Sequence, residues 1–339
     1  MKKKAVTIYD IAQRLRLSPS TVSRGLRNDA RINTNTKRLI ADTAAQLNYQ
    51  PNRVAAGLRG GSTKTIGLIV PRINRDFFAN AISGIEQVAR RHGFQLIITQ
   101  SNERLAAERE NVMALTAARV DGILASCSLE TDTMDHFTVL QKRHFPLVFF
   151  DRVPDHFIGH RVVVDDEGLA YRAVQHLLEQ GARKIAHLGG PDSVNIYANR
   201  YKGYVRALRE NNLPLRPEYI DRNCLTEQQG YPATEKLLQL PDPPEAIFSA
   251  SDWTALGIAK YCKDHGIAVP TDLAFMSFAN EPFTSIIVPA ISSIEQFSER
   301  MGAAAAELLF RQISNSEPLA PERVVIDGEL ILRESSHRQ

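Results

Sequence analysis

The stretch Thr7-Ile-Tyr-Asp-Ile-Ala-Gln-Arg-Leu-Arg-Leu-Ser-Pro-Ser-Thr-Val-Ser-Arg-Gly-Leu26 determines how the start of this chain folds. Apolar residues of its first half recur at the i, i+3, i+4 and i+7 spacing of one helix face: Ile8, Ile11, Ala12 and Leu15. Ser18 is a good N-cap, and Pro19 suits the first position of a second helix. The spacing therefore predicts two short helices joined by a tight turn, a helix-turn-helix.

Signals on both sides extend this prediction to three helices. Thr7 with Asp10 three residues later resembles a capping box with a shorter acid. A third helix is predicted from Asn33-Thr34 onward, with its inward residues at helical spacing: Ile40, Ala44 and Leu47. It stops before Pro51, because proline disfavours helix in the residue that precedes it.

Positive charge is concentrated in this part of the chain. Residues 1–64 contain 13 Lys or Arg and three Asp, a net charge of +10. The remaining 275 residues carry 28 basic and 35 acidic side chains, a net charge of −7. Such an asymmetry indicates a polyanionic partner for the small part.

The second predicted helix has the chemistry of a DNA-reading element. The N-terminal residues of such a helix face base edges in the major groove. The hydroxyls of Ser20, Thr21 and Ser23 can donate to phosphates or bases, and Arg24 can bind guanine O6 and N7 with two hydrogen bonds. The alternative is a small helical cap whose arginines form a solvated face. The charge of +10 favours DNA because it needs a counter-charge.

The segment 52–61 that follows has features of a conditional helix. Its alanines and Leu58 favour helix, but Gly57 costs about 1 kcal/mol relative to Ala. A helix of about eight residues is marginal alone. Leu58 stands among charges and suits a wedge between minor-groove base steps. A plain interdomain linker is the alternative reading.

From Thr65 onward, short apolar runs alternate with helical patterns. The predicted strands cover 66–70, 95–99, 122–126, 147–150, 162–164, 184–188, 246–249, 273–278 and 323–332. The predicted helices cover 77–92, 104–119, 132–143, 167–180, 199–211, 228–239, 252–265 and 297–314. This alternation predicts an α/β class with two Rossmann-like, doubly wound subdomains behind the three-helix head and its hinge.

Several other classes of protein are disfavoured. No apolar run approaches the ~18 residues that span a bilayer, and no CxxC pair occurs among Cys127, Cys224 and Cys262. P-loop, GxSxG and HExxH motifs are absent, and Pro154 and Gly159 disfavour a helical metal site at His156 and His160. We expect a cytoplasmic, nucleoid-associated protein that is not an enzyme and has no cofactor or metal.

Motifs along the whole chain resemble the LacI/GalR family of bacterial regulators. Those of the head are Thr7-Ile-Tyr-Asp-Ile-Ala, Ser20-Thr-Val-Ser-Arg24, Leu47-Asn-Tyr-Gln-Pro-Asn52 and Ala55-Ala-Gly-Leu58. Later ones include Ile66-Gly-Leu-Ile-Val-Pro71, Arg200-Tyr-Lys-Gly203, Ser251-Asp252 and Ile294-Glu-Gln296. The resemblance implies a periplasmic-binding-protein-like sensor with a ligand cleft between its subdomains.

The resemblance implies a division of the chain. Residues 1–50 are then the helix-turn-helix domain, 51–62 the hinge and 63–339 the effector-binding sensor. The first sensor subdomain takes about 63–161 and 292–320, and the second about 162–291 and 321–339. The expected DNA contacts are Ser20, Thr21 and Arg24 at bases, with Tyr9, Ser23, Asn28, Thr34, Thr36, Asn52, Ala55 and Leu58 as further candidates. Family members bind near-palindromic operators as dimers, so we expect a homodimer.

Ligand contacts are expected where strands of the sensor end, since open α/β sheets bind ligands at that edge. The candidates are Asn74, Phe77, Asp151, Arg200, Ser251, Asp252, Asn280 and Gln296. Structural roles are the alternative: Asp252 as a helix N-cap, Asp151 as a turn former and Arg200 as an ion-pair partner. Ser251 and Ala279 depart from the family pattern, and Asn280 or Glu281 can supply the missing polar contact.

The sequence thus predicts an operator-binding transcriptional regulator, a repressor, controlled by a small-molecule effector such as a sugar or sugar derivative. A purine or nucleoside effector is the rival within this class. A solute-binding protein shares the sensor fold, but residues 1–60 and the missing export signal count against it. An enzyme with a DNA-binding head would need a catalytic constellation, and none is evident.

Overall fold

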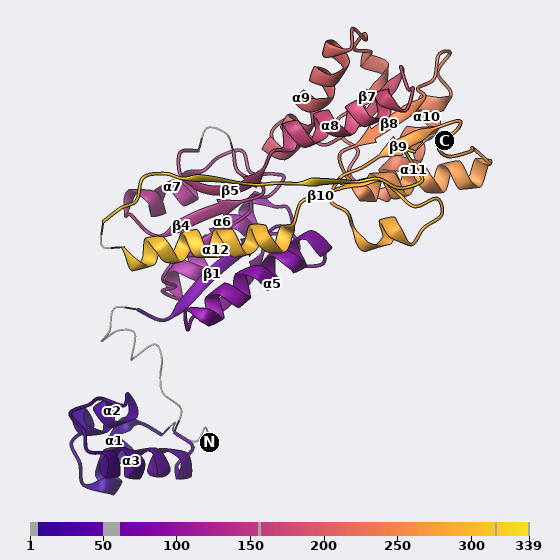
Figure 1. The fold of residues 1–339 in the computed structure, drawn as a ribbon. Coiled ribbons are helices and arrows are strands. Elements are labelled where there is room, and N and C mark those ends of the chain that lie inside the picture. Colours follow the sequence, from indigo (N-terminus) through magenta and orange to yellow (C-terminus); the bar gives the residue numbers. More distant parts are fainter. Residues whose placement is uncertain (1–5, 50–61, 155–156, 316, 338–339) are drawn as a thin grey trace. The chain divides into compact units, whose positions relative to one another are not determined.

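A computed structural model describes residues 6–49, 62–154, 157–315 and 317–337 of the chain. Two compact units make up the protein, Met1–Thr63 and Lys64–Gln339. Their elements are labelled in Figure 1.

The first unit contains the three expected helices, α1 (Ile8–Leu15), α2 (Pro19–Leu26) and α3 (Thr34–Gln46). Local caps set where they start. The backbone N–H and the hydroxyl of Thr7 both donate to Asp10 Oδ2 at 2.7 Å, and Ser18 Oγ accepts from the Thr21 N–H at 3.1 Å. These caps satisfy N–H groups that have no partner inside the helices.

A small apolar core holds the three helices together. Its buried members come from all three: Ile11, Ala12, Val22, Ile40 and Ala44. Gly25 brings α2 against α3, because a Cβ at this position would lie only 2.5 Å from Ile40 Cδ1. Arg16 ends α1 in the left-handed region, with φ of 54°, and turns the chain toward α2.

The first sheet of the second unit has six parallel strands in the order β11-β5-β4-β3-β1-β2. Their bounds are β1 (Thr65–Val70), β2 (Gln95–Gln100), β3 (Ile123–Ala125), β4 (Leu147–Phe150), β5 (His160–Val164) and β11 (Arg323–Ile326). Its helices are α5 (Asp76–Arg91), α6 (Leu105–Ala117), α7 (Asp135–Lys142) and α12 (Ser298–Ser314).

The second sheet has four parallel strands in the order β7-β6-β8-β9. Its strands are β6 (Ile185–Leu188), β7 (Ile220–Asp221), β8 (Ala246–Ser249) and β9 (Ala274–Met276). The accompanying helices are α8 (Asp166–Glu179), α9 (Asn195–Glu210), α10 (Glu227–Leu238) and α11 (Asp252–His265). Together the two sheets confirm the predicted α/β class with a doubly wound architecture.

Two strands lie in a different sheet from the one that the sequence predicted. We expected residues from about 162 and from about 321 in the second subdomain, but β5 and β11 complete the first sheet. The backbone registers decide this, since Val148 pairs with His160 and Val324 with Val162. Apolar periodicity identifies a strand but carries no information on which sheet the strand joins.

A narrow ribbon connects the two subdomains. Strand β10 (Ser293–Glu295) pairs antiparallel with β12 (Glu329–Ile331), and the segment after α12 runs from one subdomain to the other (Figure 1). We had not expected β7 or β10, because runs of two or three residues are too short for a periodic signal.

Helices α5 and α12 touch closely on one side of the first sheet (Figure 1). Gly84 and Gly302 permit this contact, because a Cβ on either glycine would collide with backbone of the facing helix at Glu299 or Ala81. Within the described ranges, no helix combines the length and the apolar character needed to cross a membrane.

Candidate functional site

The exposed face of α2 carries the predicted DNA-reading side chains. Ser20 and Arg24, one helical turn apart, are both exposed. The guanidinium of Arg24 forms no hydrogen bond or ion pair with any described residue, so it is available to a partner. Thr21 is half-buried. Its Oγ1 lies 2.8 Å from Ser18 Oγ, and Ser20 Oγ lies at the same distance from Ser18 Oγ. Ser18 therefore orders two of the predicted contacts.

The other predicted DNA contacts differ in exposure. Tyr9 on α1 is 63% exposed, and Thr34 is exposed at the first position of α3. Asn28 is exposed in the left-handed region, with φ of 60°. The half-buried side chains are Ser23, which faces Arg27, and Thr36. The hinge predictions, Asn52, Ala55 and Leu58, lie outside the described residues.

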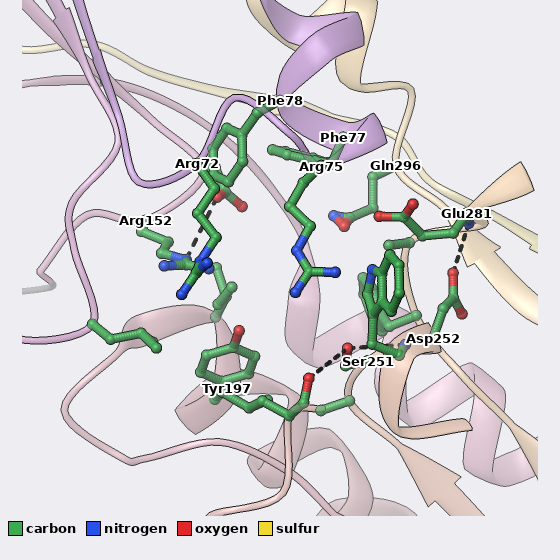
Figure 2. Close-up of a pocket in the computed structure, with 18 of the residues that line it drawn as sticks. Arg72, Arg75, Phe77, Phe78, Arg152, Tyr197, Ser251, Asp252, Glu281 and Gln296 are labelled. Carbon is green, nitrogen blue, oxygen red and sulfur yellow. Dashed lines mark hydrogen bonds and ion pairs between the residues drawn. The ribbon is translucent and has the colours of Figure 1, made fainter. Parts of the chain in front are cut away.

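In the second unit, both subdomains line a cavity of about 160 Å³. Figure 2 shows side chains entering it from opposite sides, with Arg72, Arg75 and Arg152 facing the ring of Tyr197. The residues contributed by the first subdomain include several that follow β1 and β4, and those of the second subdomain include several at the starts of α9 and α11. The cavity thus lies where the carboxyl ends of strands meet, as expected for an open α/β sheet.

Six of the eight predicted ligand contacts line this cavity: Phe77, Asp151, Arg200, Ser251, Asp252 and Gln296. Asn74 is exposed and does not line it. Asn280 does not line it either, because its side chain braces the interdomain ribbon. Its Nδ2 donates to Glu295 Oε2, and its Oδ1 accepts from Arg333, each at 2.8 Å.

Arg200 is held by its own subdomain. Its Nε donates to Asp166 Oδ1 at 2.8 Å, and one terminal nitrogen donates to the Ala250 carbonyl at 2.9 Å. The guanidinium carbon also lies 3.5 Å from the centroid of the Phe278 ring. Burial raises the pKa of Asp166 to about 6, and the charge of Arg200 opposes the rise. These contacts give Arg200 the ion-pair role that we considered as the alternative.

Asp252 has both of its carboxylate oxygens occupied. Oδ1 accepts from Ser293 Oγ at 2.6 Å and from Ser277 Oγ, and Oδ2 accepts from the Glu281 N–H at 2.7 Å. Burial raises the pKa of Asp252 to about 7 despite these donors. The helix N-cap is Ser251, whose Oγ accepts from the Trp253 N–H at 3.3 Å. Asp252 therefore connects α11 to the ribbon strand β10.

Asp151 occupies the bend after β4, with φ of 59°. Its Oδ2 accepts from Ser126 Oγ at 3.3 Å and lies 3.9 Å from Arg152 Nε. Burial raises the pKa of Asp151, while the neighbouring Arg152 and Arg200 lower it. Gln296 is only 2% exposed, and its Nε2 has no hydrogen-bond partner among the described residues.

Three arginines that we did not include among the ligand contacts line the cavity. Arg152 donates to Glu103 Oε2 at 2.7 Å, and Arg72 Nε lies 3.8 Å from Glu103 Oε1. Arg75, the N-cap of α5, stacks on Trp253 instead of pairing with an acid. The available signal was position, because Arg72 and Arg152 come two positions after β1 and β4, and Arg75 comes five positions after β1.

Two family models match the chain. Residues 7–52 match "Bacterial regulatory proteins, lacI family", and residues 174–336 match "Periplasmic binding protein-like domain". The described residues contain no group of three or more His, Cys, Asp or Glu that could hold a metal ion.

Individual proteins are similar over nearly the full length of the chain. It is 32% identical to catabolite control protein A of Priestia megaterium over 98% of this chain and 99% of that protein. It is 31% identical to the HTH-type transcriptional repressor CytR of Escherichia coli (strain K12), over 98% of this chain and 96% of that protein. A Lac repressor dimer, solved with operator and the anti-inducer ONPF, shares the fold. Its TM-score is 0.87 at 24% identity, over 98% of this chain and 99% of that chain.

Proposed function

Because the chain belongs to the lacI family of bacterial regulatory proteins, we propose how its own residues serve operator binding and effector response. It is a DNA-binding transcriptional regulator with a sensor that binds a small-molecule effector. We assign it a repressor role in the cytoplasm and no catalytic activity. The relatives reported above support this, since one of them is named a transcriptional repressor.

A single observation carries the DNA-binding assignment. Arg24 is exposed and without a partner among the described residues, on a short helix that follows a tight turn and is capped by Ser18. An arginine in this position can donate two hydrogen bonds to guanine, while Ser20 and Thr21 reach phosphates or neighbouring bases. Tyr9, Asn28 and Thr34 are exposed on the same unit and serve as additional contacts.

The hinge and the oligomeric state are part of the same proposal. Residues 51–62 form a helix only when docked on DNA, and Leu58 enters a minor-groove step. Two copies place two such leucines at the centre of one operator. The edge strand β2 offers a surface for the second copy, since Ile97 and Ile98 are 38% and 44% exposed there. Long apolar edge strands are seldom left open in native proteins.

The cavity of the sensor is the proposed effector site, and a sugar or sugar derivative is the ligand that we favour. Aromatic rings of Phe77, Tyr197 and Trp253 provide faces for a sugar ring, and the charged groups supply polar contacts. The same rings can stack on a purine, which keeps a nucleobase effector as the second candidate. A ligand that contacts both subdomains shifts their relative position, and about 1–3 kcal/mol of coupling suffices for control of DNA affinity.

The test is an operator selected in vitro from random DNA with the full-length protein. We expect one near-palindromic sequence to be enriched and to bind as a protein dimer. Its affinity should fall steeply with salt, because the basic head displaces counterions from DNA. Enrichment of no sequence, or salt-independent binding, would contradict the proposal. A dimerisation variant, Ile98→Glu, should lose the palindromic preference but keep the fold.

A further inference from the structure

The unused hydrogen-bonding capacity of the cavity consists mainly of donors. Gln296 Nε2 and Arg152 Nε are buried, and neither has a hydrogen-bond partner among the described residues. Arg75 forms no hydrogen bond or ion pair through its guanidinium within the described ranges. Burial lowers the pKa of Arg75, and the charges of Glu281 and Glu103 oppose this shift. Buried donors of this kind normally find an acceptor.

The acceptors of the cavity, in contrast, are mostly occupied. Both oxygens of Asp252 receive hydrogen bonds from within the protein. Glu103 Oε2 accepts from Arg152 and from the Leu129 N–H at 3.0 Å. Asp151 accepts from Ser126. A ligand that mainly donates hydrogen bonds would therefore find few free partners.

The charged groups that line the cavity also favour an anionic ligand. Four arginines and four acids line the cavity, but burial raises the pKa values of Asp151, Asp252 and Glu281. These acids hold protons more readily than exposed ones, whereas arginine stays charged. The charges of Glu281 and Glu103 act on Arg75, but its guanidinium pairs with neither acid at ion-pair distance within the described ranges.

The aromatic side chains that line the cavity indicate a ligand that contains a ring. Phe77 lies near Arg75, and Tyr197 faces it across the cavity (Figure 2). The Trp253 ring lies against the Arg75 guanidinium. A volume of about 160 Å³ is small beside the ~300–1,000 Å³ of sites for drug-sized ligands. One compact ring with an attached group fits these dimensions better than two linked rings.

We infer that the effector is a compact ring compound, such as a monosaccharide, bearing a carboxylate or a phosphate that Arg75 binds. Gln296 and Arg152 donate to the same ligand. This inference rests on the proposed effector role of the cavity and names its ligand class. A guanidinium is well suited to the task, because it presents paired donors to planar carboxylate or to phosphate oxygens.

The test titrates full-length protein with four probes at constant ionic strength: D-glucose, D-glucuronate, D-glucose 6-phosphate and inorganic phosphate. Trp253 fluorescence and calorimetry report binding. We expect saturable binding of inorganic phosphate and of at least one anionic sugar, at least 10-fold tighter than that of glucose. A preference for glucuronate over the 6-phosphate identifies a carboxylate, and the reverse identifies a phosphate.

Three variants localise the effect. Arg75→Gln should weaken anion binding at least 10-fold, and Arg75→Lys should recover part of it. Arg90→Gln removes an exposed charge from the same helix and should match the wild type. Circular dichroism checks that each variant is folded. The inference would be overturned if no anion gave a saturable response, or if glucose bound as tightly as the anions. It would also be overturned if Arg75→Gln bound the anions with wild-type affinity.

Operator binding is measured separately on in vitro-selected DNA. Anion binding that depends on Arg75 supports the inference even if no operator is enriched, and that failure would count against the proposed function alone. Operator binding without any anion response overturns the ligand class and leaves the regulator assignment intact.

Discussion

The guanidinium carbon of Arg75 lies 4.1 Å from the ring centroid of Trp253. Arg75 caps the helix after the first strand of one subdomain, and Trp253 lies in the first turn of α11 in the other. The contact therefore crosses the cavity and joins its two walls. Cation–π contacts of this kind contribute about 0.5–2 kcal/mol, a range that ligand binding can readily offset.

This contact gives the sensor an internal optical probe, since Trp253 is the only tryptophan. Ligand binding at Arg75 should change the emission intensity or wavelength of Trp253 with a single saturating curve. Titration of the wild type beside Trp253→Phe checks this, because the variant should bind by calorimetry without the optical signal. Calorimetric binding with no change in wild-type emission would place the ligand away from this pair.

Replacement of Arg24 by Ala should reduce discrimination between operator and random DNA. A bidentate arginine–guanine contact contributes about 1–3 kcal/mol of discrimination, so the affinity ratio should fall by roughly 5- to 150-fold. Fluorescence anisotropy on both DNAs measures the ratio. Arg38→Ala removes a charge from exposed α3 and should lower both affinities similarly. An equal loss for Arg24→Ala on both DNAs would show that Arg24 does not read bases.

Replacement of Gly84 by Ala should destabilise the sensor. The added Cβ meets backbone of α12 at Glu299, which cannot rotate away as a side chain can. Overpacking of this kind costs about 1–3 kcal/mol, which urea unfolding can resolve. Ser83→Ala, on the exposed side of the same helix, should stay within about 0.5 kcal/mol of the wild type. Equal stability of the two variants would contradict the close contact of α5 and α12.

Asp252 should make stability depend on pH. Its pKa is about 7 in the folded protein against an ordinary value of 3.8, so the folded state keeps a proton that the unfolded chain releases. Its contribution is full below about pH 4 and declines as the pH rises to about 7. Glu281 is the acid whose charge adds to the rise.

The measurement is urea unfolding by circular dichroism between pH 5 and 8. Asp252→Asn cannot titrate, so its stability relative to the wild type should increase as the pH rises through this window. Asp132→Asn, which removes an exposed carboxylate, corrects for the change in net charge. Parallel curves for wild type and Asp252→Asn would show that Asp252 is ionised throughout.

The helices of the head could be predicted because their signals are local. Thr7 and Ser18 start α1 and α2 through bonds to residues only three positions away. The apolar spacing from Ile8 to Leu15 identifies the buried face in the same way. Most strands and helices of the sensor could be predicted for the same reason.

The sequence by itself determined the order of most elements, the fold class and the exposed face of α2 that carries Ser20 and Arg24, because periodicity, caps and charge are properties of short segments. Only the tertiary structure decided that β5 belongs to the first sheet and which polar groups of the cavity remain free. Asp252 is bonded to Ser293, 41 positions away, and Arg200 to Asp166, 34 positions away. Such pairings depend on packing between distant segments, and they leave Arg75 as a cavity arginine whose guanidinium makes no hydrogen bond or ion pair with the described residues.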